Sequence, residues 1–128
     1  MISVFLRNAV LSKILRNTNF TFPTYLSLHD GDPGITGADE IAGGSYARAL
    51  ISTTQWDAAA SAQADTNVVV TFLDLPSVTL THIGLWDAAS SGNFGFGGEL
   101  AAPVVIAAGE GFAVPISALL AVAEAGSV

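Results

Sequence analysis

The sequence has no cysteine, no long apolar run and few charged residues, and each of these absences excludes a class of protein. Without cysteine there is no disulfide framework, no thiolate nucleophile and no cysteine-ligated zinc. No apolar run reaches the roughly 18 residues of a membrane-spanning helix. Arg7, Lys13 and Arg16 interrupt the apolar N-terminal stretch, which therefore also lacks the hydrophobic segment of a signal peptide. We expect no membrane partner, no export and synthesis in the cytoplasm.

The charge deficit predicts that part of the surface is covered by another protein. Charged residues make up 12% of the chain and apolar residues 51%, whereas an average soluble domain has about 25% charged residues. A monomer of this size needs more charge to face water on all sides, so we expect a homo-oligomer, with a trimer as one candidate.

The charge is also unevenly placed along the chain. The first 16 residues hold three of the four basic residues and no acid, and all eleven acids lie in the remainder. A body this acidic repels phosphate backbones, so we expect no nucleic-acid partner.

A predicted β-hairpin, residues 79–100, lies near the middle of the chain. Residues 79–86 alternate in the two-residue period of a strand, residues 87–93 are small and polar, and residues 94–100 resume an extended run. Glycines alternate with phenylalanines in the second strand, which predicts that other groups approach its backbone closely on one face. These glycines are Gly95, Gly97 and Gly98.

Further strands are predicted by short β-prone segments between turn signals: residues 20–28, 45–54, 68–75, 103–106 and 111–116. The continuous apolar run 68–75 indicates a strand buried on both faces, and Pro115 indicates an edge or an end. Residues 55–67 are interpreted as a covering loop. The tail 117–128 is compatible with a helical turn or with a last strand. The predicted fold of residues 1–128 is mainly β: a single β-sandwich-like domain, 20–116, with one N-terminal amphipathic α-helix, 2–16.

The N-terminal helix carries the candidate contact residues. Its apolar residues recur at helical spacing, Ser3 is a candidate N-cap, and Lys13 and Arg16 lie in the last turn, where cations complement the helix dipole. One interpretation is that this helix packs on the sheet of its own domain. The other is that Arg7, Lys13 and Arg16 contact an acidic neighbouring subunit, since this is the basic element of an acidic chain.

The loop 29–44 is rich in aspartate, glycine and proline. His29 and the acids of this loop would suit an oxygen-rich cation site. However, the loop lacks the EF-hand pattern, and Asp32-Pro33-Gly34 is typical of a tight turn. We favour turn chemistry over a metal site, and we expect Arg48 to pair with a nearby acid.

No motif indicates catalysis. His82, a serine and Asp87 could form a triad on paper, but there is no G-x-S-x-G elbow, no P-loop and no H-E-x-x-H motif. We therefore expect no catalytic, cofactor-binding or metal-binding residues, and a protein that is not an enzyme. An enzyme would require a histidine and a serine that converge in a pocket.

The order of segments over roughly residues 2–116 resembles a group of small virion proteins of tailed bacteriophages. These are often labelled phage tail-fibre-like proteins, and similar small β proteins occur as decoration or cement proteins on phage heads. The most specific motifs are L-H-x-x-D-P-G from Leu28, G-G-S-Y-A-R from Gly43 and I-G-L-W-D-A-A-S-S-G-N from Ile83. Members of the group end in a β-strand, and the tail 117–128 departs from that pattern.

The resemblance implies a structural protein of the virion, made in the cytoplasm of the host, whose partners are the major capsid protein or tail proteins. We favour a capsid decoration or cement protein that bridges shell subunits. The alternative is a tail-fibre or baseplate component that contributes to host-surface binding, for which Tyr46, Trp56 and Trp86 are candidate contacts. For Trp86, next to Gly84 in a predicted strand, we favour a place in the core. The group offers no catalytic residues.

Overall fold

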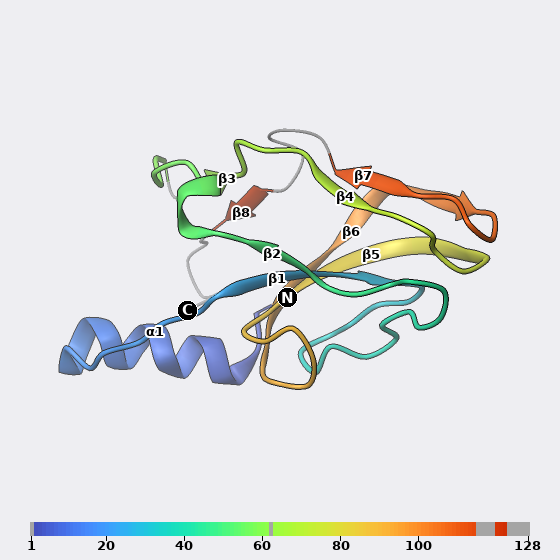
Figure 1. Cartoon of the computed structure of the whole chain (residues 1–128). Helices are drawn as coiled ribbons and strands as arrows, with labels where there is room; N and C mark the ends of the chain where they lie inside the picture. Colours follow the sequence, from blue (N-terminus) through green and yellow to red (C-terminus); the bar gives the residue numbers. More distant parts are fainter. Residues whose placement is uncertain (1, 62, 115–119, 123–128) are drawn as a thin grey trace.

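The computed structural model describes residues 2–61, 63–114 and 120–122 (Figure 1). In these ranges the fold is mainly β with one N-terminal α-helix, as predicted. The elements, in chain order, are α1 (Val4–Arg16), β1 (Thr24–His29), β2 (Ala49–Ile51), the short 3₁₀ helix η1 (Thr53–Gln55), β3 (Gln63–Asp65), β4 (Val70–Phe72), β5 (Val78–Trp86), β6 (Phe94–Ile106), β7 (Phe112–Val114) and β8 (Leu120–Val122).

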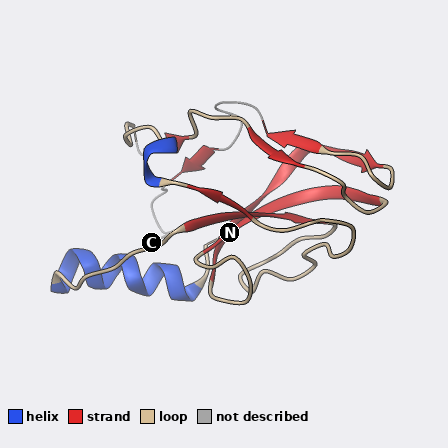
Figure 2. Cartoon of the chain, in the orientation of Figure 1, coloured by secondary structure: helices blue, strands red, loops and turns tan. Residues whose placement is uncertain are grey.

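The strands form two layers around one apolar core. The main layer is a four-stranded antiparallel sheet with strand order β2-β1-β5-β6. Two short ribbons, β3–β8 and β4–β7, lie above it, and α1 projects to one side (Figures 1 and 2). Side chains from both layers bury one another in a single cluster: Leu26, Leu28, Ile41, Ile51, Val70, Phe72, Leu75, Leu80, Leu85, Ile106 and Val114. This arrangement is the predicted β-sandwich-like domain.

The central hairpin, β5–β6, is longer than predicted. The register pairs Leu80 with Val104 but His82 with Glu99, so residues 100–103 of β6 form a bulge. Pro103 lies in this bulge, where its missing N–H costs least. The predicted strands 94–100 and 103–106 are therefore one strand.

The strand buried on both faces is β1. Leu26 and Leu28 lie in the core, while Ser27 and His29 on the opposite face are equally buried. The prediction for residues 68–75 was wrong: Leu73 is 71% exposed. The reason is that only one face of β4 packs on the core: Val70 and Phe72 are buried, whereas Thr71 between them is exposed.

The pair β3–β8 corrects one expectation and decides between the two alternatives left open for the tail. Residues 63–65 are a strand rather than part of a covering loop, and the described part of the tail, residues 120–122, is its antiparallel partner. Neither segment has a clear two-residue period, and the pairing joins distant parts of the chain. The expectation for Pro115 lies outside the described residues.

Gly95 and Gly97 confirm the predicted close approach to the second hairpin strand. A Cβ at Gly95 would lie 2.5 Å from Phe22 Cζ, and one at Gly97 would lie 2.8 Å from Pro33 Cγ. Gly98, by contrast, has open space around it. Two segments distant in sequence, at Phe22 and at Pro33, therefore pack directly on β6.

Candidate assembly interface

A serine and a histidine do converge, but on the buried face of β1 opposite the core. The Oγ of Ser27 lies 2.7 Å from Nε2 of His29, and Nδ1 of His29 lies 2.7 Å from the carbonyl oxygen of Ala38. Because a carbonyl only accepts, Nδ1 carries the proton and Nε2 accepts from the Ser27 hydroxyl. The indole N–H of Trp86 donates to the same Oγ at 3.0 Å. The side chains of Ser27 and His29 are fully buried. The pair therefore holds the loop 30–44 to β1 and has no access to a substrate.

The buried position also sets the protonation of His29. Burial lowers the pKa of its imidazole, and the hydrogen bond to Ala38 and the charge of Glu40 oppose this only in part. The neutral ring is the form that fits the two hydrogen bonds described above.

Arg48 pairs with an acid, as predicted. Its Nε and Nη2 donate to Oε1 and Oε2 of Glu40 at 2.8 and 2.7 Å, in a two-pronged ion pair. Its Nη1 donates to the carbonyl oxygens of Ala88 and Ser91 at 2.9 and 2.8 Å. One side chain therefore joins the loop 30–44 to the hairpin loop 87–93.

The carboxylate of Glu40 is held ionised inside this cluster. Burial raises the pKa of Glu40, but the hydrogen bonds from Arg48 and from the Tyr46 hydroxyl outweigh it, so the pKa lies below its usual value. Burial and the bond to Glu40 hold the pKa of Tyr46 above its ordinary value. The cluster is a closed structural network.

The aromatic residues named as candidate contacts for host-surface binding are engaged within the domain. Trp86 is 9% exposed and confirms its place in the core. Tyr46 stacks on Phe72, and the indole N–H of Trp56 donates to Oγ1 of Thr24 at 3.0 Å. None of the three side chains combines an unbonded polar group with an exposed ring face.

The remaining candidates for chemistry are not brought together. Nδ1 of His82 lies 2.8 Å from Oγ1 of its neighbour Thr81, whereas Asp87 accepts two hydrogen bonds from Asn93.

Asp32 accepts from the backbone N–H of Gly34, which has a positive φ of 58°, so this part of the loop is a turn. Among the described residues, no group of three His, Asp or Glu side chains could hold a metal ion. In the same part of the chain, no helix is long and apolar enough to cross a membrane.

The helix α1 is anchored only at its N-terminal end. Ser3 caps it by accepting from the N–H of Leu6, and the N–H of Ser3 donates to the carbonyl oxygen of Gly95 on β6 at 2.7 Å. Phe5 meets Phe20 edge to face, 6.3 Å between ring centres. From this base the helix extends away from the sheets (Figures 1 and 2).

The last turns of α1 expose an apolar stripe. Leu11, Ile14 and Leu15, at positions i, i+3 and i+4, are 41%, 70% and 76% exposed. No residue of α1 is buried. The interpretation that α1 packs on its own sheet thus holds for the first turn alone, and residues 11–16, the distal half of α1, have no covering layer among the described residues.

The three candidate contact residues differ in their surroundings. Arg7 is partly buried near the base of the helix, with its Nε enclosed and without a hydrogen-bond partner. Lys13 and Arg16 are exposed in the last turn. The ion pair found in the described part of the chain is Arg48–Glu40, so Lys13 and Arg16 are exposed without an ionic partner there, whereas Arg7 is partly enclosed.

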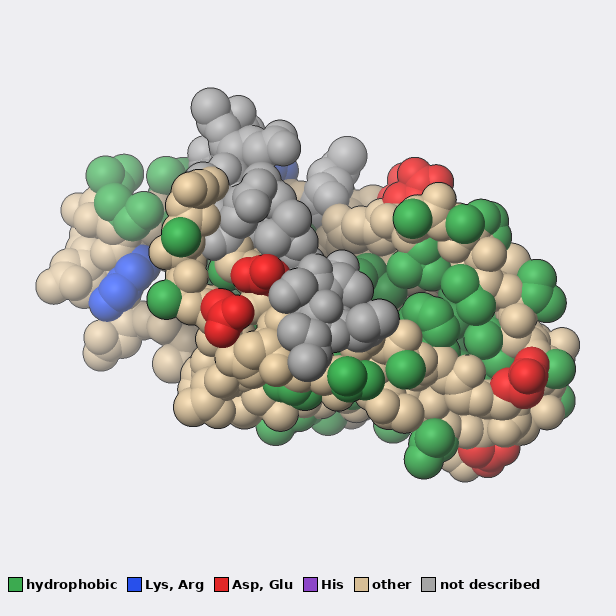
Figure 3. Space-filling model, turned by 90° about the horizontal axis from the view of Figure 1, so that it is seen from above, with side chains coloured by type: hydrophobic (Ala, Val, Ile, Leu, Met, Phe, Trp, Pro, Cys, Tyr) green, Lys and Arg blue, Asp and Glu red, His purple; other side chains and the backbone are tan. Residues whose placement is uncertain are grey.

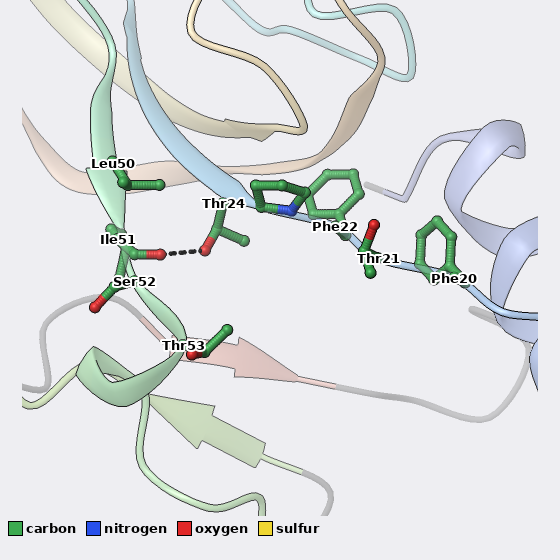
Figure 4. Close-up of a pocket in the computed structure, with 9 residues that line it drawn as sticks. Phe20, Thr21, Phe22, Thr24, Leu50, Ile51, Ser52 and Thr53 are labelled. Carbon is green, nitrogen blue, oxygen red and sulfur yellow. Dashed lines mark hydrogen bonds between the residues drawn. The ribbon is translucent and has the colours of Figure 1, made fainter.

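An open apolar groove lies beside the edge strand β2 (Figure 4). It has a volume of about 420 Å³ and is lined by residues 20–24, which lead into β1, and by residues 50–53. Thr24 Oγ1 donates to the carbonyl oxygen of Ile51 at 2.8 Å and joins the two walls. The sequence did not predict this groove because its walls come from two separate segments.

A comparison with models of known protein families shows to which family this chain belongs. A family model described as Podophage GP4 fiber I protein gp80 matches residues 1–121. The chain belongs to this fibre protein family. No curated protein matches the sequence. Membership in the gp80 fibre family confirms the predicted phage virion protein, and it favours the tail-fibre alternative over capsid decoration.

Proposed function

We propose that this protein is a structural subunit of a phage tail fibre that attaches to neighbouring virion proteins through the distal half of α1. The observation that carries the proposal is the exposure of Leu11, Ile14 and Leu15 next to Lys13 and Arg16 on a helix held only at its base. Exposed apolar side chains on a projecting helix are stabilised by burial against another protein.

The energies indicate what else the attachment needs. Burying one such side chain fully contributes about 1.5–3 kcal/mol. Leu11, Ile14 and Leu15 are already partly covered, so together they contribute less than about 9 kcal/mol, whereas association costs about 4–15 kcal/mol in lost freedom. The helix alone therefore binds marginally. Lys13 and Arg16 add specificity and speed of association with an acidic partner, and several copies in one fibre add avidity.

Two other roles have less support. Capsid decoration would use the same helix, but the family is described as a fibre protein. Host-surface binding through Tyr46, Trp56 or Trp86 lacks a platform, because these side chains are engaged inside the domain.

The proposal is tested with a Lys13→Glu, Arg16→Glu double variant produced during phage infection in place of the wild type. We expect its copy number in purified particles, measured by quantitative mass spectrometry, to fall at least tenfold. Arg7 is left unchanged because it is partly enclosed at the helix base. The isolated protein should stay folded in urea unfolding, with a loss limited to the helix-dipole contribution of the two cations, about 0.3–1 kcal/mol each.

The matched control is Asp30→Lys, which also reverses an exposed charge but lies on the loop 30–44. This control should enter particles normally. Normal incorporation of the Lys13→Glu, Arg16→Glu variant would overturn the assignment of α1.

A further inference from the structure

We propose that the distal half of α1 docks into the groove beside β2 of a second copy of the same chain. This inference rests on the proposed function and names the partner of α1. Each copy then offers one donor helix and one acceptor groove, so the contact is head to tail. Such contacts close into a ring or continue as a filament, which are both forms that a fibre can use.

The charge distribution favours a second copy over a helix-to-helix contact. Residues 1–16 carry three basic residues and no acid, while the rest of the chain carries eleven acids and Arg48, which Glu40 already binds. Two α1 helices packed together would bring like charges into contact, whereas α1 against the body brings opposite charges together. On the face seen in Figure 3, basic side chains lie at the α1 end and acidic ones over the β layers.

The surroundings of the groove have the required sign. No Lys, Arg or His lines it. Trp56 donates its indole N–H to Thr24 in the wall, and the next residue, Asp57, donates its backbone N–H to the carbonyl oxygen of Asp65 at 2.8 Å. Asp57 and Asp65 therefore belong to the segment that adjoins the groove wall through Trp56, and the Asp57 carboxylate also accepts from Nδ2 of Asn67 at 3.2 Å.

The shape of the groove suits a helix stripe. Its apolar walls come from Phe20, Phe22, Pro23, Leu50 and Ile51. An apolar cavity of about 150 Å³ holds one benzene molecule, so a groove of about 420 Å³ has room for more than one aliphatic side chain. Anchors at i, i+3 and i+4 are the pattern by which amphipathic helices enter such grooves.

The helix of the same copy does not supply this contact. Residues 20–23, which form one wall, directly follow the segment that leaves α1, and Phe20 of the wall is held against Phe5 in the first turn of the helix. The distal end of α1 points away from the sheets (Figure 1).

The absence of native cysteine allows a direct test by disulfide trapping. Two full-length variants, Ile14→Cys in the donor helix and Leu50→Cys in the groove wall, are purified reduced, mixed and oxidised with copper phenanthroline. We expect a mixed Ile14→Cys/Leu50→Cys dimer at least tenfold above either self-linked dimer. Leu73→Cys, which is 71% exposed against 55% for Leu50 and lies next to β4, is the control and should not link to Ile14→Cys above the self-linked background.

Each other outcome overturns the inference. Self-linked Ile14→Cys dimers as the main product would place α1 against α1. No mixed dimer, combined with a mass in sedimentation equilibrium that stays monomeric to millimolar concentration, would place α1 on a different virion protein. In that case the proposed function still stands if the Lys13→Glu, Arg16→Glu variant is lost from particles, and both ideas fall if it is retained.

Discussion

The guanidinium carbon of Arg48 lies 3.8 Å from the centre of the Trp86 ring. A second aromatic ring, Phe94, meets Trp86 edge to face at 5.2 Å. The cation is thus stacked on one residue of the main sheet while its nitrogens bind two loops. The guanidinium of Arg48 is fully engaged by these contacts. Arg48 therefore does not compete with Lys13 and Arg16 of a second copy for Asp57 and Asp65.

The first prediction concerns this cation. Arg48→Ala removes the ion pair and leaves the half-buried carboxylate of Glu40 without its partner. Breaking a buried pair in this way costs about 3–5 kcal/mol, which is a large part of the stability of a small domain. We expect a correspondingly lower free energy of unfolding in urea.

Two further variants keep this prediction testable if Arg48→Ala does not fold. Arg48→Lys keeps the charge but loses the two-pronged geometry and the stacking, so its loss should be intermediate. Lys13→Ala, at an exposed site, should change the free energy of unfolding by less than about 0.5 kcal/mol. Equal effects of Arg48→Lys and Lys13→Ala would contradict the structural role of the cluster.

A second prediction separates backbone strain from crowding in the loop 30–44. Gly37 and Gly34 both have positive φ, 80° and 58°, so alanine at either position costs about 1–2 kcal/mol of strain. A Cβ at Gly37 would also overlap the Trp86 ring, whereas one at Gly34 meets nothing within 4 Å. We expect Gly37→Ala to lose about 1–3 kcal/mol more than Gly34→Ala in urea unfolding. Equal losses would show that the loop moves away from Trp86 freely.

Local patterns predicted the parts of this fold that depend on near neighbours. The N-cap at Ser3, the helix that follows it, the central hairpin and the turn at Asp32-Pro33-Gly34 were all confirmed. Each is fixed by residues a few positions apart. The pairing of Arg48 was also predictable, because the remaining body offers only acids to a single base.

Features that depend on distant segments were not predictable. β1 is buried on both faces because a polar loop covers one of them, and the composition of that loop indicates exposure. Arg7 and Lys13 look alike in sequence, yet only the packing of the helix base encloses Arg7. The groove needs residues 20–24 and 50–53 side by side, which only the pairing of β1 with β2 provides.

The last prediction concerns pH and the buried imidazole of His29. In the unfolded chain this ring has the ordinary pKa of 6.5, and burial lowers the pKa in the folded protein. Between the two values the unfolded state binds the extra proton, so stability is full above pH 6.5 and falls as the pH drops towards the folded pKa. The slope is at most about 1.4 kcal/mol per pH unit. Urea unfolding at pH 7.5, 6.5 and 5.5 measures it.

The pH range and two variants assign this slope to His29. Glu40 has a pKa below 4.5, so its contribution is lost only at lower pH, outside the measured range. His29→Asn keeps an N–H that can donate to the carbonyl of Ala38, cannot take up a proton and should therefore abolish the slope. His82→Gln, the matched control, removes the other histidine and should retain it. If the slope vanished in His82→Gln and persisted in His29→Asn, the buried ring would not be the titrating group.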